Sequence, residues 1–85
     1  MIVQLRLFAT ARQAAGRSSD AFEVADDARV ADVLAAAVER YGEGFDEVLA
    51  TARVWVNGEP ADGSDTRVRA NDEVAVLPPV SGGAH

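Results

Sequence analysis

The residues best suited to chemistry stand at the end of the chain, in the sequence Leu77-Pro78-Pro79-Val80-Ser81-Gly82-Gly83-Ala84-His85. Two consecutive prolines favour an extended path that projects the following residues away from the body of a protein. Glycines have no Cβ atom and can therefore pass a constriction that excludes any side chain. A slim terminus of this kind suits insertion into the active site of another protein. An ordinary frayed tail is the alternative, because chain ends are often small and polar.

The rest of the chain offers few groups for catalysis. Its 85 residues include no cysteine and no lysine, and the single histidine is the terminal His85. The sequence therefore excludes thiolate nucleophiles, thiolate-bound zinc or iron–sulfur clusters, Schiff-base chemistry and multi-histidine metal sites. We expect no bound metal and no catalytic residue, so the chain is not expected to be an enzyme by itself.

Composition predicts one small acidic domain. Hydrophobic residues make up 48% of the chain and charged residues 26%, which is typical of a folded soluble domain with a single core. The net charge of −6 disfavours contact with nucleic-acid phosphates or anionic lipids, so neither nucleic acid nor a membrane is expected as a partner. No apolar run is long enough to span a bilayer, and the first residues resemble a strand rather than a leader. A cytoplasmic location is expected.

The first half of the chain predicts a hairpin followed by the main helix. Apolar and polar residues alternate over 2–8, an Ala-rich segment over 10–15 favours a helical turn, and residues 21–24 predict a returning strand. Apolar residues at helical spacing predict a helix over 30–41, with Asp26 or Asp27 as the N-cap and Gly42 as a left-handed C-cap. Residues 43–51 are expected to connect, with a short helical turn around Phe45.

The second half predicts two more strands. Residues 53–56 form a strand that enters a tight turn at Asn57-Gly58, because both residues accept the positive φ angles of a primed turn. Residues 60–66 are expected to be a loop, Val68 a buried anchor, and residues 73–77 the last strand, which the prolines end. The order predicts an α+β fold in which one main helix crosses one face of a mixed sheet of four to five strands.

Strand alternation predicts which large side chains lie on the other face of this sheet. If the valines and leucines of the strands face the helix, then Phe8, Trp55, Ala75 and Leu77 lie on the open face. Large apolar side chains that are exposed together usually mark a protein interface. The alternative is that the 60–66 loop or the Ala-rich segment covers them as a second small core. Exposed arginines, including Arg6, are expected only to increase solubility.

Several of these features occur together in one known family. They are Leu7-Phe8-Ala9 with Arg12 and Gly16 after it, the helix, Val56-Asn57-Gly58, and the run from Asn71-Asp72-Glu73 through Leu77-Pro78-Pro79 to Gly82-Gly83. Over nearly the whole chain this combination resembles the MoaD/ThiS family of ubiquitin-like sulfur carriers, and within it most closely MoaD, the small-subunit type of molybdopterin synthase. The resemblance implies a ubiquitin-like β-grasp domain over residues 1–80 and a flexible diglycine tail over residues 81–85.

The resemblance also implies a function in which the partners supply all catalytic groups. The Gly83 carboxylate would be adenylated with ATP by an E1-like, MoeB-like adenylyltransferase and converted to a thiocarboxylate with sulfur from a sulfurtransferase or cysteine desulfurase. The tail residues Val80, Ser81 and Gly82 would enter a MoaE-like large subunit, where the sulfur builds molybdopterin. No cofactor would stay bound. The implied partner interface comprises Phe8, Arg12, Trp55, Ala75, Leu77, Pro78 and Pro79.

The sequence departs from the family pattern at its end, because Ala84 and His85 follow the second glycine. Gly83 then has no free carboxylate, and we expect a JAMM-type metalloprotease to cleave between Gly83 and Ala84. An expression remnant is the alternative explanation for these two residues. Other functions left open are a sulfur carrier for thiamine, cysteine or another thio-metabolite, a ubiquitin-like protein modifier, and a non-covalent binding module.

Overall fold

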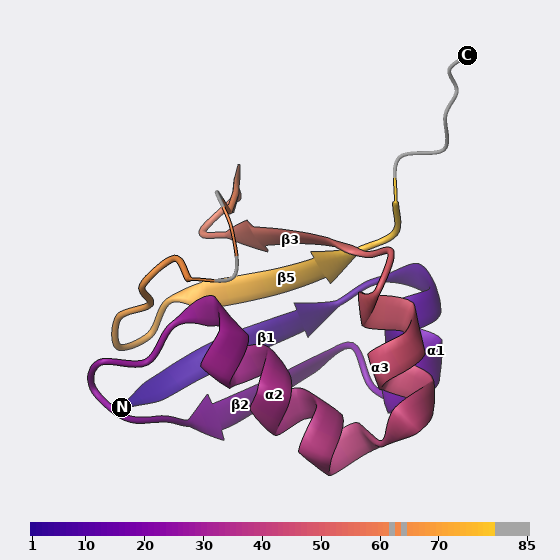
Figure 1. The fold of residues 1–85 in the computed structure, drawn as a ribbon, viewed down its shortest axis with the longest axis horizontal. Coiled ribbons are helices and arrows are strands. Elements are labelled where there is room, and N and C mark those ends of the chain that lie inside the picture. Colours follow the sequence, from indigo (N-terminus) through magenta and orange to yellow (C-terminus); the bar gives the residue numbers. More distant parts are fainter. Residues whose placement is uncertain (62, 64, 80–85) are drawn as a thin grey trace.

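A mixed sheet with helices on one face forms the described part of the chain, residues 1–61, 63 and 65–79 of the computed structural model (Figure 1). This part contains a five-stranded sheet and three helices. In chain order the elements are β1 (Ile2–Leu7), α1 (Ala9–Ala15), β2 (Ser19–Glu23), α2 (Val30–Tyr41), α3 (Glu43–Leu49), β3 (Arg53–Val56), β4 (Glu59–Pro60) and β5 (Glu73–Leu77). The predicted α+β class is confirmed, with three helices where one main helix was expected.

The strand order is β2-β1-β5-β3-β4. β1 pairs with β2 in the antiparallel direction and with β5 in the parallel direction, so the first and last strands are neighbours in the middle of the sheet. β3 pairs with β5 in the antiparallel direction on the other side. Both the first strand and the returning strand differ slightly from the expected bounds, because β1 ends at Leu7 and β2 covers Ser19–Glu23.

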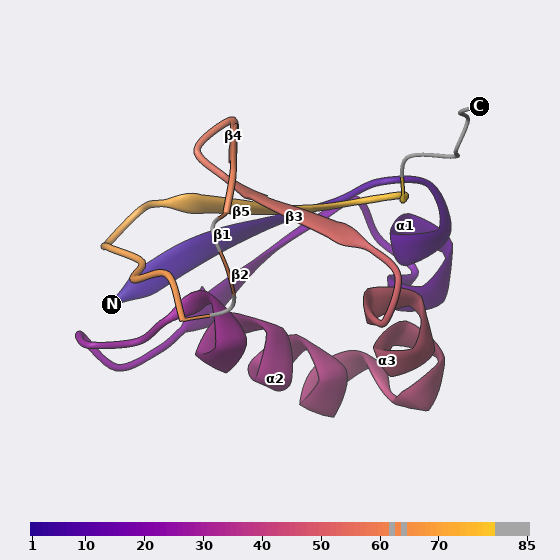
Figure 2. The ribbon, with the colours of Figure 1, turned by 45° about the horizontal axis from the view of Figure 1, so that its top comes forward.

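The core lies between the sheet and the helices α2 and α3 (Figure 2). The alternation in β1 buries every second residue, and the helical stripe of α2 buries three positions against it. Val68, the predicted anchor, is also buried. The fully buried larger side chains are Val3, Leu5, Leu7, Val30, Val33, Phe45, Val74 and Val76.

The start of α2 corrects one prediction. Arg29 is the N-cap residue, whereas Asp26 and Asp27 lie before it and are exposed. The backbone N–H of Arg29 donates a hydrogen bond of 2.8 Å to Oδ2 of Asp32, three residues into the helix. This carboxylate satisfies a free N–H group and also favours the positive end of the helix dipole. At the other end, Gly42 caps the helix with a positive φ of 98° but an extended ψ of −171°, so the predicted left-handed cap conformation is wrong.

The expected connection after Gly42, with its short helical turn around Phe45, is the seven-residue helix α3. Its Phe45 is fully buried, and the ring packs edge-on against Tyr41 with 5.1 Å between the centroids. Burial of one aromatic side chain stabilises a helix that is too short to form alone in water. α3 therefore closes one end of the core.

The Asn57-Gly58 turn is confirmed and joins two parts of the chain. The φ angles are 51° and 84°, as a primed hairpin turn requires, and the turn returns the chain into the two-residue strand β4 in place of the expected loop start. The Asn57 side chain donates a hydrogen bond of 3.0 Å to Asp72 and accepts one of 2.9 Å from the backbone N–H of Glu73. These bonds fix the entry to β5.

Asp20 connects β2 to the end of α2. Its Oδ2 atom accepts hydrogen bonds from the Tyr41 hydroxyl at 2.6 Å and from Arg40 at 2.9 Å, and it forms an ion pair with Arg17 at 3.3 Å. Burial by itself raises the pKa of Asp20. The hydrogen bonds from Tyr41, Arg40 and the Ala21 N–H have a larger combined effect in the opposite direction, so the pKa falls from the ordinary 3.8 to about 2. Burial, followed by the bond to Asp20, raises the pKa of Tyr41. The carboxylate is thus held in its charged form.

Asp20→Asn should reduce the loss of stability in acid. Because the folded-state pKa of Asp20 is below its ordinary value, the charged group stabilises the fold above about pH 4, and this contribution of about 1 kcal/mol disappears as the pH falls towards 2. Urea unfolding of dilute protein at pH 5 and at pH 2.5 should show a smaller difference for the variant than for the unchanged chain. Equal differences would mean that Asp20 is not coupled to folding.

Candidate functional site

The candidate site begins where β5 ends in the middle of the sheet. β5 is parallel to β1 and antiparallel to β3, so its last residue lies near the end of β1 and the start of β3. The N–H of Phe8 donates a hydrogen bond of 3.1 Å to the carbonyl of Val76. Pro78 and Pro79 follow and are exposed. Strands on both sides therefore fix the point from which the last described residues leave the sheet.

The register of the strands brings the predicted apolar residues together on the open face. Trp55 lies opposite Ala75, and Leu77 lies opposite Arg53. Phe8 follows Leu7, which is opposite Val76, and this places Phe8 beside Leu77. We call Phe8, Trp55, Ala75 and Leu77 the exit patch, because they lie on the open face around the end of β5.

The exit patch is separate from the core. The helices α2 and α3 lie on the other side of the sheet (Figures 1 and 2). Phe8 keeps 39% of its surface exposed, and Trp55, Ala75 and Leu77 are half-buried. None of the four belongs to the core cluster formed by the described residues, and none of them is fully buried.

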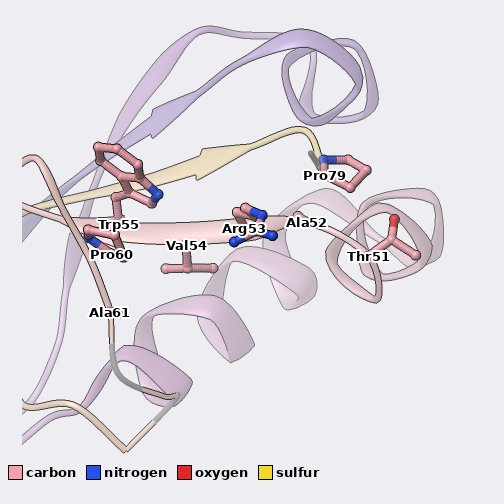
Figure 3. Close-up of a pocket in the computed structure, with 8 residues that line it drawn as sticks. All are labelled: Thr51, Ala52, Arg53, Val54, Trp55, Pro60, Ala61 and Pro79. Atoms are coloured by element: carbon pink, nitrogen blue, oxygen red, sulfur yellow. The ribbon is translucent and has the colours of Figure 1, made fainter. Parts of the chain in front are cut away.

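A shallow groove of about 420 Å³ adjoins the exit patch along β3. Trp55 and Pro60 stand next to each other at one end of the groove, and Pro79 lies at the other end (Figure 3). Arg53 and Trp55 point to the same side of β3, whereas Val54 points towards the helices. The groove thus runs from the β3–β4 hairpin to Pro79, the last described residue. Pro60 was expected only as part of a loop and is a residue that sequence reasoning missed.

Two arginines also belong to this surface, although the sequence suggested only a solubilising role. Arg6 lies opposite Ala75 and places its guanidinium carbon 5.7 Å from the centre of the Phe8 ring. It also forms an exposed ion pair of 3.4 Å with Glu73. Arg53 lies opposite Leu77. The apolar patch is therefore bordered by positive charge in an acidic chain, and the signal for Arg6 is its strand position two residues before Phe8.

The remaining predicted interface residue, Arg12, lies on α1. It is exposed, and α1 contacts β5. α1 begins directly after Phe8 at Ala9, whose φ of 51° is in the left-handed region that non-glycine residues rarely adopt. This turn takes the chain from the sheet into α1 within one residue, and it leaves Phe8 at the rim of the open face. Backbone strain of this kind is often found at functional sites.

The tail residues themselves lie outside the described part of the chain. This applies to Val80, Ser81, Gly82 and Gly83, and to Ala84 of the expected cleavage site. Their predicted roles in insertion, sulfur transfer and processing stay predictions. Within the described residues, no helix is long and apolar enough to cross a membrane.

The sequence matches the ThiS family over residues 5–83. Among curated proteins, it is 33% identical to a molybdopterin synthase sulfur carrier subunit of Chlamydomonas reinhardtii, covering 98% of this chain and 100% of that protein. It is 38% identical to small archaeal modifier protein 3 of Haloferax volcanii, again covering 98% and 100%. These similarities include the whole described fold.

Solved structures agree with this result. The crystal structure of a small archaeal modifier protein from Haloferax volcanii superposes with a TM-score of 0.79 at 33% identity, covering 98% of this chain and 100% of that one. A chain in the complex of subunits 1 and 2 of the molybdopterin-converting factor from Helicobacter pylori superposes with a TM-score of 0.68 at 26% identity, covering 98% and 100%. The ubiquitin-like β-grasp fold expected from the sequence is therefore confirmed.

Phe8→Ala should change stability little if Phe8 is a surface residue. We expect a loss of about 1 kcal/mol or less, because the ring is outside the core. The matched control is Phe45→Ala, which removes a fully buried ring and should cost about 3–5 kcal/mol. Thermal and urea unfolding measure both values. A similar loss for the two variants would show that Phe8 belongs to a core.

Proposed function

We propose, because the chain belongs to the ThiS family of ubiquitin-like sulfur carriers, that it carries sulfur as a thiocarboxylate on Gly83 and delivers it for molybdopterin synthesis. One observation supports this proposal more than any other. The family match ends at residue 83, the second glycine, directly after the strand and diproline that precede the tail. The residues that the chemistry needs are therefore within the matched region, and the two following residues are outside it.

The chemistry accounts for a glycine at this position. A carboxylate is a poor electrophile until one of its oxygens becomes part of a leaving group, which adenylation with ATP provides. A sulfur nucleophile can then attack the carbonyl carbon and displace AMP. The unbranched glycyl group hinders this attack least, and it lets the activated carbonyl reach a narrow active site. ATP is bound by the activating enzyme and not by this chain.

The described fold supports a carrier that is held at its base. Pro78 and Pro79 have no N–H group and so cannot extend the pairing of β5. Leu77 is the last paired residue and lies opposite Arg53 of β3, and Val76 before it lies opposite Leu7 of β1. A partner that binds the exit patch would therefore find the start of the tail in a fixed position.

The proposed partners are an E1-like adenylyltransferase, a sulfurtransferase or cysteine desulfurase, and a MoaE-like large subunit of molybdopterin synthase. The last of these is supported by the Chlamydomonas relative, whose name makes it a molybdopterin synthase subunit, and by the two-subunit complex from Helicobacter. The exit patch with Arg6 and Arg53 is the proposed docking surface for the adenylyltransferase and the large subunit, since the tail must enter both active sites from the same strand end.

Removal of Ala84 and His85 is part of the proposal. In the full sequence the Gly83 carbonyl is in a peptide bond and cannot be adenylated. Hydrolysis between Gly83 and Ala84 by a JAMM-type metalloprotease would release the carboxylate. The extension would then keep the carrier inactive until it is processed.

A second candidate function is covalent protein modification. The 38% identity to small archaeal modifier protein 3 supports it. A modifier uses the same adenylated glycine, but the attacking group is the amine of a lysine on a target protein. The chain has no lysine of its own, so it could not build chains on itself.

The intact mass of the protein tests the sulfur-carrier proposal. Three versions are compared: the full chain, a chain that ends at Gly83 and a chain that ends at Gly82. With the activating enzyme, ATP and a sulfur donor from the same host, the chain ending at Gly83 should exchange one oxygen for sulfur. The full chain should do so only after the metalloprotease is added, and the chain ending at Gly82 should be a poor substrate.

The contrary results separate the alternatives. Conjugates with a Gly83–lysine isopeptide bond would favour the modifier function, because the same tail would then be attached to protein. No change in mass for any of the three versions, with an activating enzyme that accepts another carrier from the host, would leave only a non-covalent binding module.

Phe8→Ala should weaken binding to the activating enzyme or the large subunit by about tenfold or more if the exit patch docks there. Ile2→Ala is the matched control, because Ile2 is 40% exposed, against 39% for Phe8, and lies on the same face at the other end of β1. Isothermal titration calorimetry with each purified partner measures the affinities. Equal effects of the two substitutions would mean that the docking surface lies elsewhere.

A further inference from the structure

The edge strand β2 has one row of backbone groups directed away from the sheet. Met1 and Val24 exchange hydrogen bonds of 2.7 and 2.9 Å, and Leu7 donates one to Ser18. In an antiparallel pair such bonded positions alternate, so Phe22 and Asp20 also direct their backbone groups at β1. The backbone groups of Ser19, Ala21 and Glu23 therefore face outward.

The two edges of the sheet differ in their ability to pair with another strand. β4, at one edge, has two residues, and one of them is Pro60, which has no N–H group. β2, at the other edge, has five residues and no proline. A free edge of this kind is a template for pairing with another chain, and folded proteins commonly protect it.

The centre of the β2 edge is occupied by side chains of the same molecule. The outward N–H of Ala21 donates a hydrogen bond of 2.8 Å to Oδ1 of Asp20. The outward carbonyl of Ala21 accepts one of 3.2 Å from the guanidinium of Arg40 on α2. Both backbone groups that an added strand would need at this position are thus already bonded.

These two side chains are held firmly in place. Arg40 donates a second hydrogen bond to Asp20, and its guanidinium carbon lies 3.9 Å from the centre of the Phe22 ring. The same Asp20 oxygen, Oδ2, also accepts the Tyr41 hydrogen bond described above. An incoming strand would have to break this network before it could bond to Ala21, and a charge-assisted network is more costly to break than solvation by water.

We propose that Asp20 and Arg40 close the β2 edge against a second copy of this chain, and that β2 is a self-pairing surface which opens when Arg40 is removed. In the paired form, two β2 strands run antiparallel about Ala21, and each Ala21 bonds to the other through its outward N–H and carbonyl. This surface is separate from the exit patch, so its test does not depend on the function proposed for Gly83.

A second copy is the occupant that the strand itself fits. Antiparallel pairing centred on Ala21 places Ser19 opposite Glu23 and Asp20 opposite Phe22, so no two like charges are directly opposite. Ser19, Ala21 and Glu23 are exposed, and a groove of about 330 Å³ between β2 and α2 adjoins this edge; it is lined by Phe22, Glu23, Ala36, Glu39 and Arg40. Because β4 is a poor edge, the joined sheet cannot extend further, and the assembly is a closed dimer.

Arg40→Met tests the proposal, because methionine keeps an apolar stem over Phe22 but cannot bond to Ala21. Arg17→Met is the matched control, since it removes the same charge and another ion pair with Asp20 without contacting Ala21. In sedimentation equilibrium, the unchanged chain and Arg17→Met should stay monomeric, whereas Arg40→Met should dimerise. Its dimer dissociation constant should be about tenfold or more lower than that of the unchanged chain. Arg40→Gln and Arg40→Ala are measured in parallel.

A proline substituted at position 21, the centre of the β2 edge, tests whether the dimer forms through this edge. Ala21→Pro removes only the outward N–H, so it leaves the β1–β2 bonds in place and should return the Arg40→Met chain to a monomer. Folded, monomeric Arg40 variants would overturn the proposal, as would assemblies larger than a dimer or a dimer that survives Ala21→Pro. Unfolding of all three Arg40 variants would also overturn it, because Arg40 would then be required by the fold itself.

Discussion

The parallel pairing of β1 with β5 is the constraint on which the rest of the structure depends. Parallel neighbours cannot be joined by a tight turn, so all the other elements lie in the connection between them. The pairing places the end of the last strand beside the end of the first, in the middle of the sheet. The last described residues therefore leave the sheet from a strand that is paired on both sides, and Phe8 lies next to the end of this strand.

The same arrangement explains why the two faces of the sheet differ. α2 and α3 cover one face, where alternate residues of β1 and β5 and Phe22 of β2 are buried. The other face keeps the exit patch, bordered by Arg6 and Arg53, although the chain as a whole is acidic. An apolar patch next to arginine side chains gives a partner both burial and orientation, and a rigid sheet presents them at little cost in entropy.

Asp20 has two structural roles: it joins β2 to α2, and it bonds to the outward backbone of Ala21. Its position alternates with outward residues in β2, so the carboxylate points to the helix side, where Tyr41 and Arg40 satisfy it. One oxygen joins β2 to α2, and the other bonds to the Ala21 N–H at the edge. A buried aliphatic residue would pack as well at this position, but it could do neither.

The sequence by itself determined the elements whose signals are local. The alternation in β1, the apolar stripe of α2, the Asn57-Gly58 turn and the strand before the prolines each depend on neighbouring residues, and all four were predicted correctly. The family and its fold could also be predicted, because the motifs that carry the resemblance are local. The open-face positions of Phe8, Trp55, Ala75 and Leu77 followed from strand alternation alone.

Tertiary structure decided what depends on residues far apart in the chain. The local sequence predicted only a short helical turn around Phe45, and this turn is part of the seven-residue α3 because Phe45 fills the end of a core built by other elements. The N-cap of α2 is Arg29 because the Asp32 carboxylate accepts a hydrogen bond from its backbone N–H. The Arg29 guanidinium also donates a hydrogen bond to the Asp65 carbonyl, far away in the sequence. Arg6 borders the exit patch because of the β1–β5 register, and Arg40 bonds to Ala21 because α2 packs against β2. Such contacts are set by packing and register, whose energies become defined only when the whole sheet has formed.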